Sequence, residues 1–244
     1  MDDEPRLVRQ LTPADTETNE VVAESGVEAD RSGIEHQPPL QHDQEWANAL
    51  THALATAGTL VVGSHMVMLA AAKSNGLAIA CGVYVASVFV TFLFSTLSHI
   101  ILRQPALNTL RAWDQAMIYA MISGTYTPIA YQYASESAQV PLLVAIWIAA
   151  AIGILAKLVF RHRINSIGAI SYLLLGWLPA IPLAGHVPSV LAWLMLAGGV
   201  TYTVGVVLLM NDRKVRYMHA AWHICVITAA GCHYLGILRF VVQG

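Results

Sequence analysis

The stretch LAIACGVYVASVFVTFLFSTLSH, residues 77–99, decides the fold class of this chain. It runs for 23 residues without an Asp, Glu, Lys or Arg. A helix of roughly 20 mostly apolar residues crosses the ~30 Å hydrocarbon core of a bilayer. The stretch therefore predicts a transmembrane helix that ends in a histidine, His99.

Six further apolar runs, separated by short polar breaks, repeat this pattern near 50–72, 112–132, 140–160, 166–184, 189–210 and 217–240. The chain of 244 residues is 56% apolar and 11% charged, and its mean hydropathy is +0.57. A soluble domain is roughly 25% charged, so the composition strongly disfavours a soluble fold. We predict an all-α membrane protein, a seven-transmembrane-helix bundle. Pro179 and Pro182 are expected to distort the outer end of the fifth span.

The segment before the first span has a different composition. Residues 1–45 hold 12 of the 15 acidic residues and lack periodic apolar positions, so they cannot bury enough surface to offset their ordering entropy. We expect a disordered acidic tail over 1–45 and the membrane domain over 46–244. The tail has no basic start and no apolar run, so it is not a secretory signal peptide. It is either a solvated tail or a regulatory, partner-binding segment.

The loop charges predict the orientation. The breaks after the second, fourth and sixth spans hold seven basic residues, whereas the opposite breaks hold only Lys73. By the positive-inside rule the N-terminus is cytoplasmic and the C-terminus lies outside, the reverse of a G-protein-coupled receptor. The seven basic residues are Arg103, Arg111, Arg161, Arg163, Arg213, Lys214 and Arg216.

Four ionisable residues lie at the cytoplasmic ends of three spans: His99, Asp114, His219 and His223. His219 and His223 are one helical turn apart, so both imidazoles can reach one ion, and His99 can supply a third nitrogen. Three protein ligands and an open position are typical of catalytic zinc. Asp114 is then expected to hydrogen-bond the water at the metal, with Ser95 beside it.

Two alternatives to a metal site remain open for the histidines. Histidines at span ends are often interfacial hydrogen-bonding groups rather than ligands. His52 with His65, and His219 with His233, have spacings that would allow two spans to clamp two haems. His233 lies too deep to share an ion with His223. It is expected either to make an interhelical hydrogen bond, for instance with a Tyr or Ser, or to contact substrate or relay protons.

The three cysteines exclude two kinds of site. Cys81, Cys225 and Cys232 all lie in apolar segments, so they form no disulfide framework. No CxxC pair is present, which excludes a zinc ribbon.

Five motifs occur in order along the chain: Glu45-Trp46-Ala47-Asn48-Ala49-Leu50-Thr51-His52, Ser95-Thr96-Leu97-Ser98-His99, Asp114, Gly124-Thr125-Tyr126-Thr127-Pro128, and His219-Ala220-Ala221-Trp222-His223 with His233 beyond. Together these motifs resemble the hemolysin III proteins of the progestin and adipoQ receptor (PAQR) family. The resemblance runs from about Glu45 to Phe240.

The resemblance implies a seven-helix bundle with a cytoplasmic N-terminus, in a bacterial inner (plasma) membrane. It implies that His99, His219 and His223 bind zinc, with Asp114 and Ser95 as catalytic residues. One departure is Ser98, which stands where a tyrosine is often found. Membrane lipid is the expected substrate or ligand, and no nucleic-acid partner is expected.

Three functions are compatible with this resemblance. The first is a zinc-dependent, ceramidase-like hydrolase of a membrane lipid amide or ester. The second is a non-enzymatic receptor or membrane-homeostasis protein in which zinc is structural. The third, a cytolytic pore, is disfavoured because no span carries a repeated polar stripe. A retinal pump is disfavoured because the seventh span has no lysine.

Overall fold

The computed structural model describes residues 41–160, 166–212 and 214–244, which form one helical unit. Most of the expected tail, and the loop residues Arg161, Arg163 and Arg213, lie outside the described residues. The last residues of the range expected to be disordered, His42–Glu45, are helical and form the first turn of a membrane helix. The rest of that expectation stays a prediction.

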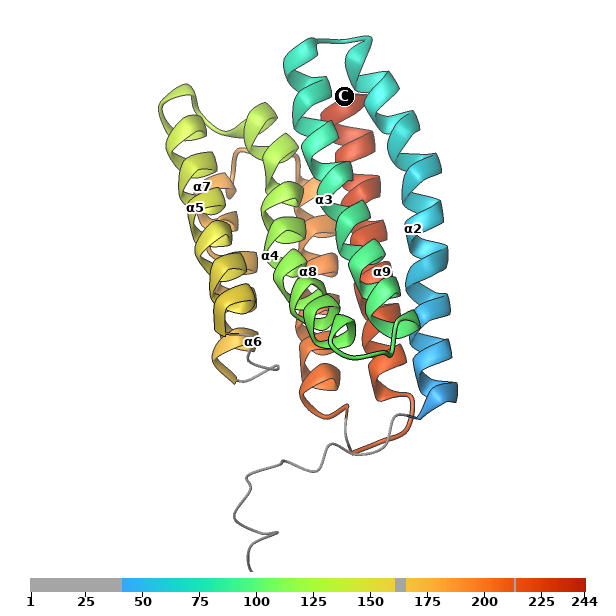
Figure 1. Ribbon diagram of the computed structural model, residues 1–244. Helices are drawn as coiled ribbons and strands as arrows, with labels where there is room; N and C mark the ends of the chain where they lie inside the picture. The colour runs from blue at the N-terminus through green and yellow to red at the C-terminus, as the bar shows by residue number, and fades with distance from the viewer. Residues whose placement is uncertain (1–40, 161–165, 213) are drawn as a thin grey trace, which may run out of the picture. The chain divides into compact units, whose positions relative to one another are not determined.

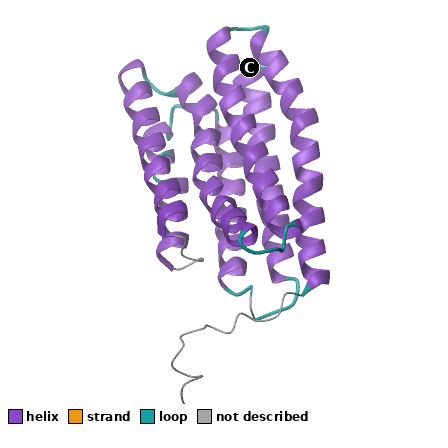
Figure 2. Cartoon of the chain, in the orientation of Figure 1, coloured by secondary structure: helices purple, strands orange, loops and turns teal. Residues whose placement is uncertain are grey.

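Every regular element in the described residues is a helix, which confirms the all-α prediction (Figures 1 and 2). The elements are α2 (His42–Ala71), α3 (Asn75–Ile100), α4 (Ala106–Tyr133), α5 (Glu136–Phe160), α6 (Ser166–Trp177), α7 (Ala180–Leu183), α8 (Ser189–Met210), α9 (Met218–Gly236) and a π-helix (Ile237–Val242) that continues α9.

Five of these helices are long and apolar enough to cross a bilayer: α2, α3, α5, α8, and α9 with its π-helical continuation. α4 is long, but many of its polar side chains point inward, among them the buried Ser123, Thr125 and Thr127. α6 ends at Trp177, just before Pro179, and the short α7 follows. These two features explain why five helices, rather than seven, meet the length and hydropathy required of a span.

The packing of α3 against α4 depends on the motif around Gly124. A Cβ atom at Gly124 would lie 2.5 Å from the Ser87 Oγ and 2.6 Å from its Cβ, so only glycine allows this approach. Thr91 on α3 donates a hydrogen bond of 2.9 Å to the backbone carbonyl of Met117 on α4. The motif therefore positions α4 beside α3 rather than supplying a reactive group.

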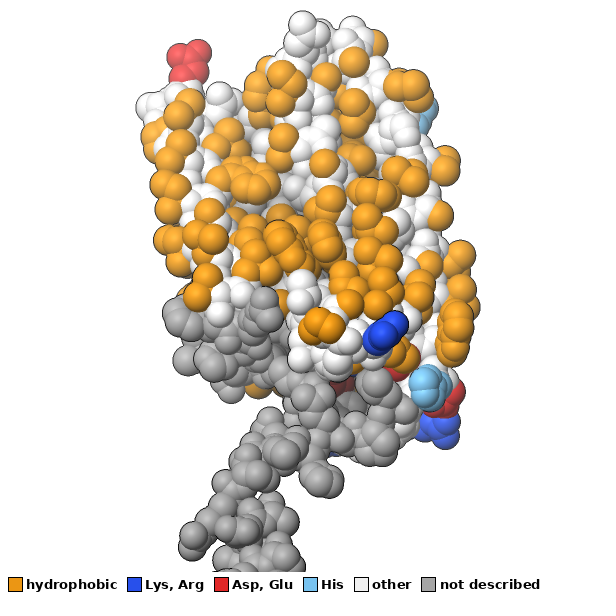
Figure 3. All heavy atoms as spheres, viewed as in Figure 1, with side chains coloured by type: hydrophobic (Ala, Val, Ile, Leu, Met, Phe, Trp, Pro, Cys, Tyr) orange, Lys and Arg blue, Asp and Glu red, His pale blue; other side chains and the backbone are white. Residues whose placement is uncertain are grey.

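The remaining contacts bring four helix ends together. α2 packs against α3 and α9, and α8 packs against α9. The start of α2, the end of α3 and the starts of α4 and α9 all lie at the lower end of the unit in Figure 1. In Figure 3, apolar side chains cover the upper and middle flank of the visible face, and basic, acidic and histidine side chains gather towards the lower right. This polar end contains the candidate site.

Candidate metal centre

Three histidines from two helices converge at the polar end. His99 lies at the end of α3, and His219 and His223 lie one turn apart at the start of α9. One potential ligand atom from each lies within 4.8 Å of the other two. Ring centroids are 5.1 Å apart for His99 with either partner, and 4.7 Å for His219 with His223. His99 and His223 are buried, and His219 is half-buried.

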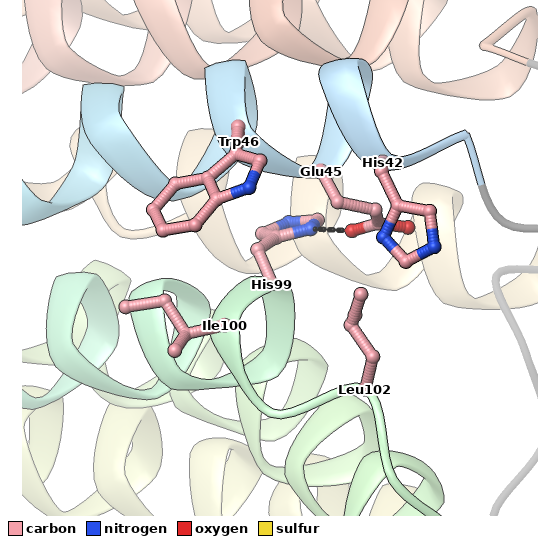
Figure 4. Close-up of a pocket in the computed structure, with 6 residues that line it drawn as sticks. All are labelled: His42, Glu45, Trp46, His99, Ile100 and Leu102. Carbon is pink, nitrogen blue, oxygen red and sulfur yellow. Dashed lines mark hydrogen bonds and ion pairs between the residues drawn. The ribbon is translucent and has the colours of Figure 1, made fainter.

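A carboxylate holds the ring of His99. The Nδ1 atom of His99 lies 2.6 Å from the Oε2 atom of Glu45, in the first turn of α2 (Figure 4). The other carboxylate oxygen accepts a 3.0 Å hydrogen bond from Arg111 on α4. Glu45 therefore links α2, α3 and α4 around one imidazole.

The other two histidines are held in the same way. The Nδ1 atom of His219 lies 3.0 Å from the Oδ2 atom of Asp212, in the turn before α9. The Nδ1 atom of His223 lies 3.1 Å from the backbone carbonyl oxygen of Asn48 and 3.1 Å from the Thr51 hydroxyl. All three Nδ1 atoms thus have hydrogen-bonding partners, so Nε2 is the nitrogen of each ring that can bind a metal ion.

This donor set fits a metal ion. Imidazoles that bind metals usually donate their other ring N–H to a carboxylate or carbonyl, which sets the tautomer and the ring orientation. The Nε2 atom of His99 is buried and has no hydrogen-bond partner, although buried polar atoms are nearly always paired. Among the described residues the convergent group contains three imidazoles and no carboxylate or thiolate, which suits zinc with an open position.

The two residues expected beside the metal lie on α4 (Asp114) and on α3 itself (Ser95). Asp114 is half-buried on α4, and its Oδ2 atom accepts a 3.2 Å hydrogen bond from the hydroxyl of Ser98. Ser98 directly precedes His99, so Asp114 is tied to the last turn of α3. Ser95 is fully buried one turn before His99. The departure at Ser98 therefore supplies a direct link between α3 and Asp114.

The haem arrangement does not agree with the positions of the histidines. His52 is buried and its ring stacks on that of His223, with centroids 3.6 Å apart, whereas His65 on the same helix is exposed. The Nε2 atom of His233 lies 3.2 Å from the backbone carbonyl oxygen of Met195 on α8. His233 thus makes an interhelical hydrogen bond, but to a carbonyl rather than to a Tyr or Ser side chain.

A small pocket of about 190 Å³ opens beside His99, between the first turn of α2 and the end of α3. Figure 4 shows the Glu45 carboxylate against the imidazole on one side and the Trp46 indole on the other. Trp46 and Ile100 are exposed on the outer surface. The pocket lining comprises His42, Glu45, Trp46, His99, Ile100 and Leu102.

Sequence reasoning missed the residues that hold the histidines. Glu45, Asn48 and His52 are spaced three and four apart, so they form one polar stripe on an otherwise apolar helix. That stripe was the available signal. Asp212 gave none, because it is one charge in a polar break between spans.

The chain is similar in sequence to known proteins. A family model described as "Haemolysin-III related" matches residues 40–234. "Hemolysin-3" from Bacillus cereus is 31% identical over 82% of this chain and 92% of its own length. "Hemolysin-3 homolog" from Bacillus subtilis (strain 168) is 28% identical over 82% of this chain and 95% of its own. The human "Monocyte to macrophage differentiation factor" is 26% identical over 62% of this chain and 66% of its own length.

Proposed function

The chain belongs to the haemolysin-III-related family of the PAQR superfamily, and from this premise we propose that it is an integral membrane zinc-dependent hydrolase of a lipid amide or ester. The proposal rests on one observation. Three convergent imidazoles each have Nδ1 paired with an oxygen of the chain, from Glu45, Asp212 and Asn48. Such pairing is typical of metal-binding histidines.

The proposed chemistry divides between the ion and the chain. His99, His219 and His223 would hold the zinc ion, which when bound would supply Lewis-acid activation of water at neutral pH. Asp114 orients the attacking water and accepts its proton, while the Ser98 hydroxyl holds the carboxylate in place. The Ser95 hydroxyl donates a hydrogen bond to the oxyanion that develops on the lipid carbonyl.

The depth of the site favours a lipid substrate. His99 is the penultimate residue of α3 and His219 the second of α9, so the cluster lies at the end of both helices. Ester and amide groups of membrane lipids lie in the interfacial region, at the same level as helix ends. The exposed Trp46 beside the pocket suits this level too, since indoles concentrate at membrane interfaces.

The proposal includes a topology. α4 and the α6–α7 pair serve as the third and fifth of seven spans, residues 46–244 form the membrane domain, and the acidic tail is cytoplasmic. The C-terminus lies outside a bacterial plasma membrane. The matches to Bacillus proteins support a bacterial setting.

The test is fatty-acid release from a broad panel of acyl lipids by the zinc-loaded protein in bilayers. For Asp114→Asn we expect zinc to stay bound and turnover to fall by about 10²-fold or more, the usual scale for losing a general base. Glu136→Gln is the control, because Glu136 is exposed at the start of α5 and far along the chain from the site. No release by the wild-type protein would refute the hydrolase and favour a receptor or homeostasis protein with structural zinc.

A further inference from the structure

A second polar group lies on α2 beside the histidine cluster. Asn48 and His52 are one helical turn apart and are 5% and 3% exposed. Among the described residues, five buried side-chain polar atoms have no hydrogen-bond partner, and three are the Asn48 Oδ1 atom and both ring nitrogens of His52. A fourth is the Nε2 atom of His99. The unpaired polar atoms are therefore concentrated around His223.

These atoms need partners that the chain does not provide. Burial of an unpaired polar group in an apolar environment costs several kcal/mol of folding free energy, and a membrane domain excludes the bulk water that could pair with it. A neutral imidazole has one N–H donor and one acceptor nitrogen, and the Asn48 oxygen is an acceptor. A partner for both residues must therefore donate and accept hydrogen bonds. A hydroxyl group does both.

His52 is not suited to be a fourth ligand of the metal. Its ring lies nearly parallel to that of His223, at 10°, with centroids 3.6 Å apart. Nitrogen lone pairs lie in the ring plane, so the lone pairs of two stacked imidazoles lie in nearly parallel planes and do not point towards one atom. The Phe92 ring, 5.0 Å away, contacts His52 as well. The nitrogens of His52 can then be reached only at the ring edge.

We propose that Asn48 and His52 form a hydroxyl-binding subsite next to the metal centre. One ring N–H of His52 donates a hydrogen bond to the hydroxyl oxygen, and the hydroxyl hydrogen is donated to the Asn48 Oδ1 atom. The hydroxyl belongs either to a buried water or to a lipid; the second case rests on the proposed function. The subsite lies on the first turns of α2, which also hold His99 and His223.

Thermal unfolding in a double-mutant cycle tests the subsite. His52→Phe keeps a flat ring to stack on His223 but removes both nitrogens, and Asn48→Leu leaves the backbone carbonyl that His223 uses. If both residues bind one hydroxyl, each single change leaves the other residue unpaired. Each should lower the melting temperature by a few degrees, while the double variant should lose less than the sum. His65→Phe, at an exposed position of α2, should change nothing.

The opposite pattern would overturn the subsite. If the atoms are simply unpaired, each single change removes a buried polar group and raises the melting temperature, and the two effects add. If His52→Phe does not fold, the melting temperatures of Asn48→Leu and His52→Gln still test the subsite, because glutamine retains a hydrogen-bond donor and an acceptor. Only Asn48→Leu should then be destabilising.

A lipid pair identifies the source of the hydroxyl. Binding of diacylglycerol and of its O-methyl ether is compared in bilayers by ligand-induced thermal shifts. With a lipid hydroxyl in the subsite, the wild-type protein should bind diacylglycerol about tenfold more tightly than the ether, which corresponds to about 1.4 kcal/mol for one hydrogen bond. Asn48→Leu should lose this preference, because the ether lacks only the hydrogen that the Asn48 Oδ1 atom accepts. With a bound water, neither protein discriminates while the cycle still shows coupling. Lack of lipid turnover with a coupled cycle would refute the hydrolase and leave the subsite standing.

Discussion

Removal of the Glu45 carboxylate should weaken zinc binding although Glu45 is not itself one of the convergent ligands. Glu45 accepts from His99 at 2.6 Å and from Arg111 at 3.0 Å, and it is only 13% exposed. In Glu45→Ala the imidazole loses the partner that sets its tautomer and orientation. Loss of such an outer partner typically costs about 10–100-fold in metal affinity, or about 1.4–2.7 kcal/mol.

Two substitutions separate orientation from charge. Glu45→Gln keeps an oxygen that can accept from His99 but presents an amide N–H to Arg111, so we expect the smaller loss, about tenfold. Glu45→Ala should lose zinc affinity by about 100-fold, the upper end of that range. Zinc affinity is measured by competition with a fluorescent chelator in detergent, with Glu136→Gln as the matched control. A Glu45→Ala protein that binds zinc within about twofold of wild type would refute the reasoning.

Two further predictions concern packing and topology. Gly124→Ala should destabilise the bundle by about 1–3 kcal/mol, because its Cβ would overlap the Ser87 side chain. Adding Ser87→Gly should restore most of this loss, and thermal unfolding measures both effects. Gly231→Ala on α9 is the control and should change little, because no atom lies within 4 Å of its added Cβ. Reporter fusions should place the C-terminus outside and the N-terminus in the cytoplasm; a cytoplasmic signal from a fusion at Gly244 would contradict the charge-based orientation.

The three histidines could be predicted because helical periodicity and span position are both one-dimensional. A spacing of four places His219 and His223 on one helical face, and the ends of apolar runs fix the membrane depth of His99. The apolar runs likewise predicted α3, α5 and α8 to within a few residues. Where a helix carries inward-facing polar residues, as α4 does, hydropathy alone identifies a span less well.

The outer partners could not be predicted because they depend on tertiary contacts. Glu45 reaches a histidine 54 positions away and Asn48 one that is 175 away, and no local spacing encodes either distance. Composition even misplaced Glu45, since its acidic neighbours grouped it with the tail rather than with α2. The start of α2 at His42 follows from contacts of its first turn with α3, α4 and the Tyr217 region.

The most direct test of the central claim is to identify the bound metal and its ligands by X-ray absorption at the zinc edge of the purified protein. We predict about one zinc per chain, bound by three imidazole nitrogens at about 2.0–2.1 Å and one further light atom, and loss of this signal in His223→Ala. A protein purified from zinc-replete cells that contains no zinc, or whose zinc is bound by sulfur, would contradict the proposed centre of His99, His219 and His223.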